Sequence, residues 1–412
     1  MPLRLLKPNL PRTVNWLTLL AFVLRLMARL NSGVASFWVN GYTFFFAMAQ
    51  NIAQGKGIGF DGIPTAFRVP LYPIVLAGLT LGYKAFWPIA IAQCMIGAGT
   101  AFCAAWLARD MFRGPAAAPA AILSAGITAV YPYYVIHDTA LEETSLFTLL
   151  TLVAVMLLRK ATETSKSTFG AGAGLLLGFD VLTRATIAPF AFAAPFWLAW
   201  RKQARAGLAC AFVLTLTVAP WLVRNYFVVG VPALSTETGL EMWNGNNGFL
   251  FRHYPKESSD LSKADALNAL SIPDKQELAR IGSNEELTNR WFLNKAFSWM
   301  REHPRQTLLD DFRKIAAAFY WLPSPRRGRI ADLAYALSYG PVMLLGGWGM
   351  WRRRSRWRED SLIYLLFLTF ILVTAVFWAH TSHRAYLDVY WIVFAAGALS
   401  EIRPHIARRF AA

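Results

Sequence analysis

Apolar runs of about 17–22 residues recur along the whole chain, and they constrain its fold more than any other feature. A run of that length is long enough to cross about 30 Å of hydrocarbon as an α-helix. Only 16% of the residues are charged, whereas about a quarter are charged in typical soluble domains. The sequence therefore predicts an all-α polytopic membrane protein.

Ten of these runs are predicted to span the membrane. They cover residues 15–30, 88–108, 116–136, 144–158, 169–183, 185–200, 207–223, 332–351, 362–378 and 386–399. Arg25 and Arg29 near the far end of the first run are expected to reach back to the interface. The formal net charge of +17 comes from short basic clusters at the ends of apolar runs. That placement is a signal of membrane topology, and it argues against nucleic acid as a partner.

One segment, residues 69–82, decides the topology. If it lies in the membrane interface instead of spanning, nearly every short basic cluster falls on the inner side, as the positive-inside rule requires. Both ends of the chain are then cytoplasmic. The first loop, the polar turns at 137–143 and 380–384, and the long region 228–330 then share the outer side.

The chain is expected to have three parts. Residues 1–227 form a membrane module with a first outer loop at 31–87, residues 228–331 form an outer helical region, and residues 332–412 form the last membrane helices. The first loop is predicted to roof a cavity between the spans.

The outer region, residues 228–331, is predicted to be helical. Ser283 and Glu286 make a capping-box pattern, and Pro304 is placed to open the next helix. An apolar stripe on that helix is expected to pack on the membrane part. It consists of Leu308, Leu309, Phe312, Ile315 and Phe319.

Signals for cofactors are few. Cys94, Cys103 and Cys210 lie inside apolar runs, which is typical of buried structural thiols. His380 and His383 form a pair in one turn, which is weak evidence for a metal site. We therefore assign no metal ligands and leave a divalent cation, Mg²⁺ or Mn²⁺, open as a cofactor.

Ionisable residues at the outer ends of the spans are the candidates for chemistry. Arg68, Arg184, Arg224 and Arg384 all fall on that side. Guanidinium groups that converge from separate helices suit a phosphate or pyrophosphate, with lipid headgroups as the alternative ligand. Asp180 precedes Arg184 by one helical turn within a span, so the two can pair.

Five motifs in a fixed order give a more specific signal. They are AFRVPLYP at 66–73, YPYYVIHDTALEETSLF at 131–147, LTRATIAP at 182–189, APWLVRNYFVVG at 219–230 followed by WNGNN at 243–247, and HRAYLDVYW at 383–391. The ordered set resembles the GT-C glycosyltransferases. It is most similar to glycosyltransferase family 39 and to the bacterial aminoarabinose- and dolichyl-phosphate-mannose-type mannosyltransferase-like members.

This resemblance implies a helix bundle with an outer cavity in the bacterial inner membrane, with the active site facing the periplasm. A sugar would move from a polyprenyl-phosphate donor to a glycan, lipid or protein acceptor of the envelope, with membrane lipids around the site. The arginines would hold the phosphate, and a carboxylate would take the proton of the acceptor.

The chain departs from the family at one position. The acidic residue that the family carries in the first loop falls at Asn40, and an amide cannot accept that proton. The candidates for the base are therefore Asp61, Glu142 and Glu143, with Glu143 preferred. Candidate substrate contacts within the motifs are Tyr72, Asp138, Asn246 and His383.

Two other functions fit the same cavity. One is a lipid-linked sugar transporter or flippase, and the other is a non-catalytic relative that binds lipid phosphate. The amide at Asn40 is compatible with both. No inverted internal repeat is visible in the sequence, which argues against a transporter.

The topology has a direct test. A cysteine introduced by Gly114→Cys should react only with reagent added from the inner side, and one introduced by Asp61→Cys only with reagent added from outside. Labelling of Gly114→Cys from outside would show that residues 69–82 span the membrane.

Overall fold

The computed structural model of the protein describes residues 10–39 and 42–409. Its helices coincide with the apolar runs, because backbone in hydrocarbon must satisfy its hydrogen bonds within each segment. The bundle contains α1 (Arg12–Asn31), α5 (Phe86–Met111), η1 (Gly114–Ala116), α6 (Ala117–Val130), α7 (Pro132–His137), α8 (Thr144–Thr164), α9 (Ser167–Thr183), η2 (Ala185–Ile187), α10 (Ala188–Trp200), α11 (Ala204–Val229), α17 (Arg329–Arg352), η4 (Arg354–Arg356), α18 (Trp357–Val376) and α19 (Thr381–Arg409).

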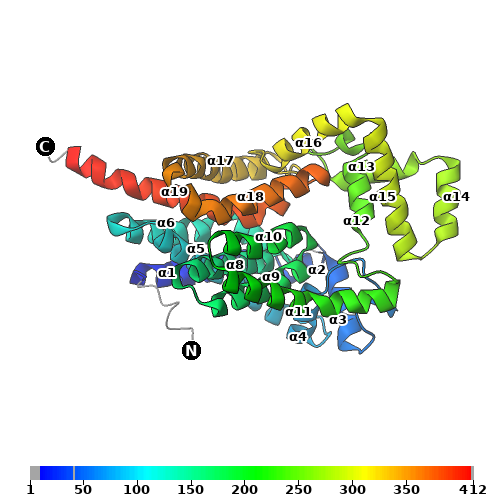
Figure 1. Ribbon diagram of the computed structural model, residues 1–412, viewed down its shortest axis with the longest axis horizontal. Coiled ribbons are helices and arrows are strands. Elements are labelled where there is room, and N and C mark those ends of the chain that lie inside the picture. The colour runs from blue at the N-terminus through cyan, green and yellow to red at the C-terminus, as the bar shows by residue number, and fades with distance from the viewer. Residues whose placement is uncertain (1–9, 40–41, 410–412) are drawn as a thin grey trace.

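Two further groups of elements lie outside these long helices. The first loop contains α2 (Val34–Val39), α3 (Thr43–Ala53), β1 (Gly59–Phe60), β2 (Ile63–Pro64) and α4 (Leu71–Thr80). The outer region contains α12 (Thr238–Gly245), η3 (Leu250–Arg252), α13 (Ser259–Asn268), α14 (Ile272–Ile281), α15 (Glu285–Glu302) and α16 (Pro304–Ala318). Figure 1 shows α12–α16 gathered at one end of the bundle, whereas α19 ends at the opposite end.

Six of the described helices, α1, α5, α8, α11, α18 and α19, are long and apolar enough to cross a membrane. In α11 the most apolar window has mean hydropathy 2.0, yet only 22% of it is buried. Apolar side chains that no other helix covers are those that face lipid. The predicted all-α membrane class is thus confirmed. Three other predicted spans lie in the shorter apolar helices Gly114–Val130, Ser167–Thr183 and Ala185–Trp200, so the count of ten stays a prediction.

The segment that decides the topology forms α4, a helix of 10 residues. At 1.5 Å per residue it is about 15 Å long, which is half of the hydrocarbon thickness. Leu81 ends it in the left-handed region with φ of 50°. α4 alone is therefore too short to span, as the interfacial interpretation requires.

Glycines bring α9 and α11 into close contact. Gly170, Gly174 and Gly178 follow one face of α9 at four-residue spacing, as in the small-residue stripes of packed membrane helices. A Cβ atom at Gly170 would lie 2.2 Å from the carbonyl oxygen of Ala206, and one at Gly174 would lie 2.3 Å from that of Cys210. The two backbones are therefore closer than any larger side chain permits, and this contact fixes the end of α9 at the site described below.

The first membrane helix carries a buried charge. Arg25 is fully buried, and its Nε donates to Asp138 Oδ2 at 2.6 Å. Its Nη atoms donate to the carbonyl oxygens of Ala21, Ala129 and Thr128. The expectation that Arg25 reaches back to the interface is wrong, because a carboxylate and three carbonyls meet its guanidinium inside the bundle. Arg29 likewise binds inside, to the carbonyl oxygen of Thr139 at 2.8 Å.

The outer region has a small core of its own around Trp243, Trp291 and Phe292. Pro304 opens α16 as predicted. The capping residue of α15 is Asn284, one position after Ser283, because the Asn284 side chain accepts a hydrogen bond from the Leu287 amide at 2.9 Å.

The apolar stripe of α16 does not pack as expected. Leu308, Leu309 and Phe312 are each more than half exposed, and only Phe319 beyond the helix end packs against the bundle. α16 instead buries Lys314, whose Nζ lies 2.9 Å from Asp311 and 3.3 Å from the carbonyl oxygen of Gly245. The face of α16 that turns inward is thus the one that carries Lys314, and the leucines lie on the exposed face.

The α9–α11 contact can be tested by adding one methyl group. Gly174→Ala should destabilise the protein by about 1–3 kcal/mol, because the new Cβ has no room against the Cys210 carbonyl. Thermal unfolding in detergent measures the effect. Gly126→Ala is the matched control, since its Cβ would meet Leu17 at an ordinary 3.8 Å and helix propensity favours alanine. An equal loss in both variants would contradict the role of the close approach.

Candidate functional site

An arginine–glutamate pair joins the ends of two bundle helices. Glu143 immediately precedes α8, and Arg184 immediately follows α9 with extended backbone at φ −151°. Arg184 donates to the same oxygen, Glu143 Oε1, through Nη2 at 2.7 Å and through Nε at 3.1 Å. Arg184 also donates to Thr144 Oγ1 at 3.2 Å and lies over the Phe147 ring at 4.9 Å. The pair is therefore held rigidly at the mouth of the bundle.

Three polar atoms around this pair have no hydrogen-bond partner within the described part of the chain. They are Glu143 Oε2, Arg184 Nη1 and the Tyr72 hydroxyl, and all three are buried. Burial first, and then the charges of Glu143 and Glu142, raise the pKa of Tyr72 well above its ordinary value, so these groups act on one another. Buried polar atoms without partners are rare in folded proteins, and a group of them is typical of a site that binds a ligand.

Glu142 points to a different partner from Glu143. Its carboxylate makes a very short contact with His137 Nδ1 within the turn between α7 and α8. Burial alone would raise the pKa of Glu142, but His137 and Arg184 lower it below its ordinary value. Glu142 is therefore held as a carboxylate, and His137 occupies one of its oxygens.

A second arginine–glutamate pair comes from the loops. Arg68 Nη2 lies 2.7 Å from Glu237 Oε1, with the Arg68 side chain 37% exposed. Backbone bonds place the two segments side by side, because the Thr236 amide donates to Ala66 O at 3.0 Å and Ser235 Oγ donates to Phe67 O at 2.6 Å. Burial raises the pKa of Glu237 to about 7, against the opposing charge of Arg68.

Tyr42 in the first loop lies close to both pairs. Its amide donates to the carbonyl oxygen of Leu141 at 2.9 Å, directly before the turn that carries Glu142 and Glu143. Its ring lies 5.4 Å from that of Phe44, and Arg68 lies 5.1 Å over the same Phe44 ring. The candidate site therefore lies between the ends of α8 and α9 and the first loop, with Glu237 at its rim.

The four predicted phosphate arginines do not all meet there. Arg68 and Arg184 belong to the site. Arg224 donates to the carbonyl oxygens of Thr65 and Ile58, each at 2.7 Å, and so ties the first loop to α11. Arg384 is fully buried.

Arg384 has partners of its own. It donates to Asp388 at 2.9 Å and to the Ala318 carbonyl at 2.8 Å, and it lies 3.6 Å over the Tyr339 ring. The expected convergence of Arg384 with Arg68 and Arg184 is corrected on this point, because these partners hold it among α16, α17 and α19.

Two predicted substrate contacts also have structural partners. Asp138 binds Arg25 within the bundle. Asn246 donates to the carbonyl oxygens of Met242 at 2.8 Å and Val376 at 2.7 Å, which joins the outer region to the end of α18. His383 lies in the first turn of α19, which contacts α7 where the Tyr133 hydroxyl lies 3.3 Å from Thr381 Oγ1. The Tyr72 ring packs 5.2 Å from that of Phe45 in α3.

The predicted partner of Arg184 is also different. α9 ends at Thr183, so Arg184 leaves the helix direction and binds Glu143 instead of Asp180. Asp180 accepts a hydrogen bond from Thr151 Oγ1 at 2.6 Å.

Two candidate bases in the first loop stand apart. Asp61 is exposed in the turn of the β1–β2 hairpin, where it and Gly62 both have positive φ as a type I′ turn requires. Asn40 lies outside the described residues. Among the residues that are described, no group of three or more His, Cys, Asp or Glu side chains is placed to hold a metal ion. A role for a divalent cation stays a prediction.

Two comparisons with known proteins find similarity to this chain. Residues 69–223, less than half of the chain, match the model of the dolichyl-phosphate-mannose-protein mannosyltransferase family. The chain is also similar to the oligosaccharyltransferase of Archaeoglobus fulgidus, solved tethered through a disulfide bond to an acceptor peptide with the NVT sequon. The likeness has a TM-score of 0.51 and 15% identity, and it covers 95% of this chain and 50% of that one.

The chain has a GT-C fold. The resemblance seen in the ordered motifs is thereby confirmed. The chain spans half the length of the oligosaccharyltransferase that it matches. A search of curated proteins finds no match.

Several residues of the candidate site were not found from the sequence. Glu237 and Tyr42 lie in none of the five motifs, and His137 lies within the motif at 131–147 but was not singled out there. The position of Glu237 directly after a Ser-Thr pair, eight residues beyond the end of α11, is a weak signal, because such a residue lies near the mouth of the bundle only if the loop folds back.

The Arg68–Glu237 pair predicts a pH dependence. With its pKa raised to about 7, Glu237 is neutral at pH 6 and charged at pH 8, where it competes with an anionic ligand for Arg68. A short polyprenyl phosphodiester carries one charge at both pH values. It should bind about 1.4- to fivefold more tightly at pH 6, because an ion pair with a partly exposed partner contributes about 0.2–1 kcal/mol.

Titration of this phosphodiester by intrinsic fluorescence at the two pH values measures the effect. Glu237→Gln should bind equally well at both. If the affinity of Glu237→Gln still differs between pH 6 and pH 8, another group causes the pH dependence.

Proposed function

We propose that this protein is a membrane glycosyltransferase that moves a sugar from a polyprenyl-phosphate donor to a hydroxyl-bearing acceptor. The observation that carries the proposal is the set of buried atoms without partners, Glu143 Oε2, Arg184 Nη1 and the Tyr72 hydroxyl. One is a proton acceptor and one is a cationic donor, and both belong to a single ion pair. This is the combination that transfer from a phosphate leaving group needs.

The two residues of the Arg184–Glu143 pair have different roles in this proposal. Arg184 binds Oε1 of Glu143 twice, which orients the carboxylate and leaves Oε2 directed away from the pair. Oε2 accepts the proton of the acceptor hydroxyl while the acceptor oxygen bonds to C1 of the sugar. The bond from C1 to the phosphate oxygen breaks, and the phosphate leaves with the electron pair.

The leaving phosphate gains negative charge as that bond breaks. Arg184 Nη1 and the guanidinium of Arg68 supply positive charge for it, and their forked geometry suits phosphate oxygens. Donors held in place before the reaction stabilise such developing charge without reorganisation. Direct displacement of this kind inverts the configuration at C1.

The family match and the fold favour a lipid-linked sugar as donor. We further propose that the site faces the outside of a bacterial inner membrane and that the acceptor is an envelope glycan, lipid or protein. The basic clusters at the other ends of the helices support this orientation through the positive-inside rule.

Turnover of a labelled polyprenyl-phosphate sugar by purified protein tests the proposal. Glu143→Gln should lower the rate by a factor on the order of 10²–10⁴, the range for loss of a general base. Glu142→Gln and Asp61→Asn are matched controls, because His137 occupies Glu142 and Asp61 is exposed. Both should keep most of the activity.

Other outcomes separate the alternatives. Full activity of Glu143→Gln would overturn the general-base role. Transfer that appears only in Asn40→Asp would favour a non-catalytic relative that binds lipid phosphate. Movement of the labelled lipid between leaflets without transfer of its sugar would favour a flippase. Repeating the assay with EDTA, and with Mg²⁺ or Mn²⁺ restored, tests the divalent cation.

A further inference from the structure

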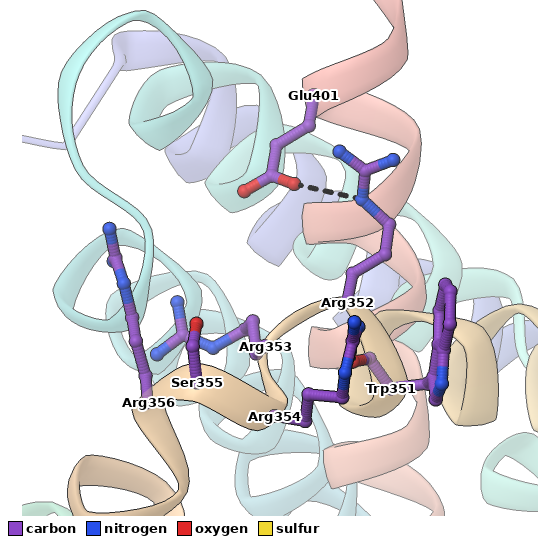
Figure 2. Close-up of a pocket in the computed structure, with 7 residues that line it drawn as sticks. All are labelled: Trp351, Arg352, Arg353, Arg354, Ser355, Arg356 and Glu401. Carbon is purple, nitrogen blue, oxygen red and sulfur yellow. Dashed lines mark hydrogen bonds and ion pairs between the residues drawn. The ribbon is translucent and has the colours of Figure 1, made fainter.

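A basic pocket of about 370 Å³ lies where α17 ends and α18 begins. Its lining consists of Trp351, Arg352, Arg353, Arg354, Ser355, Arg356 and Glu401. Figure 2 shows the four arginines around the turn formed by η4, with Glu401 contributed by α19. Four positive charges against one negative charge give the lining a formal charge of +3.

Only one of the four guanidiniums is fully engaged. Arg353 is buried and binds both oxygens of Asp360, at 2.8 Å and 3.0 Å, and the carbonyl oxygen of Met111. Arg352 is about one-third exposed and touches Glu401 at 3.3 Å. Such a contact is long for a charge-assisted hydrogen bond, so Arg352 keeps most of its capacity to bind an anion.

The other two arginines are freer still. Arg354 donates to the Trp351 carbonyl at 3.1 Å and lies 4.3 Å over the Trp351 ring. The Arg356 side chain is exposed, and no carboxylate lies within ion-pair distance of it in the described part of the chain. Three guanidiniums that share a pocket with one carboxylate repel one another, and an anion with several oxygens relieves that repulsion.

The position of the pocket along α19 shows at which membrane surface it lies. α19 carries His383 near the candidate site and Glu401 at this pocket, 18 residues apart. At 1.5 Å per residue that is about 27 Å, close to the thickness of the hydrocarbon layer. The pocket therefore lies at the opposite membrane surface from the candidate site.

Tryptophans mark the headgroup level at this surface. Trp351 in the pocket is 60% exposed, and Trp200 and Trp357 nearby are each about half exposed. The Trp200 and Trp357 rings lie 6.0 Å apart. Exposed tryptophans of membrane proteins lie at the interface between hydrocarbon and water.

We propose that this pocket binds the phosphate headgroup of an anionic membrane lipid. The acyl chains would extend along the exposed apolar surface of α17, where Leu344 is 71% exposed. Trp351 would lie beside the glycerol region, and the guanidiniums of Arg352, Arg354 and Arg356 would bind the phosphate oxygens. The site is separate from the proposed catalytic site and does not depend on glycosyl transfer.

Native mass spectrometry with added phosphatidylglycerol tests the proposal. The variant Arg352→Gln/Arg354→Gln/Arg356→Gln leaves the Arg353–Asp360 pair intact. It should retain this lipid about 100-fold more weakly, since each of the three arginines near an anionic lipid is worth about fivefold. Salt of about 0.5 M, where the screening length falls to roughly 4 Å, suppresses diffuse attraction.

A charge-matched control removes three cations from the same membrane surface. Lys166, Lys202 and Arg205 are exposed in neighbouring turns, and Gln203 joins these turns through a hydrogen bond to Ser165 at 3.0 Å. Lys166→Gln/Lys202→Gln/Arg205→Gln should retain the lipid within about twofold of the unmodified protein. An equal loss of lipid retention in the two triple variants would show that the pocket is not a specific lipid site.

Three further measurements sharpen the result. Glu401→Gln removes the competing carboxylate and should tighten lipid retention about fivefold, a gain that misfolding cannot produce. Replacement of the three arginines by lysine should recover only part of the lipid retention. Full recovery would show that the phosphate is not bound through paired donors of the guanidinium groups. Inorganic phosphate at 10 mM should not displace the lipid, and displacement would assign the pocket to a soluble phosphate compound instead.

Discussion

Charges inside an apolar helix bundle need partners, and the structure depends on how they are paired. Arg25 binds Asp138, Arg353 binds Asp360, Arg384 binds Asp388 and Arg184 binds Glu143. Removing one member of a buried pair costs about 3–5 kcal/mol, so each pair fixes the segments that carry it. The pairs of Arg25 and Arg384 also use nearby carbonyls, which completes their hydrogen bonding. The Arg184–Glu143 pair alone among these four leaves an oxygen and a nitrogen without partners in the described chain.

The surroundings of that pair explain how a site arises from helix ends. The close backbone contact between α9 and α11 fixes the point where α9 stops, and Arg184 follows at once. Glu143 precedes α8, whose first turn supplies Thr144 as a second partner. The first loop closes over this point because Arg224 of α11 binds its carbonyls. Rigid helices thus position Glu143 and Arg184, and a loop held by hydrogen bonds from Arg224 to its backbone lies against the helix ends.

The fold was largely predictable from the sequence, and the site only in part. Long apolar runs with basic ends predicted the helices, because a single segment in hydrocarbon can satisfy its backbone hydrogen bonds only as a helix. Motif order predicted the GT-C fold, and two candidates for the site, Glu143 and Arg184, form an ion pair in the structure. Partners of buried charges were not predictable, since Arg25 and Asp138 are 113 positions apart. Glu237 was missed for the same reason, because only the folded loop brings it to Arg68.

The separation between Arg25 and Asp138 also matters for how the protein is made. The first helix emerges from the ribosome with Arg25 in its second half, and the carboxylate partner of this arginine is synthesised 113 residues later. At about 5–20 residues per second, that delay is roughly 6–20 s. An unpaired arginine within a membrane helix opposes the release of that helix into lipid. We therefore expect the first helix to settle fully in the bilayer only when the turn before α8 supplies Asp138.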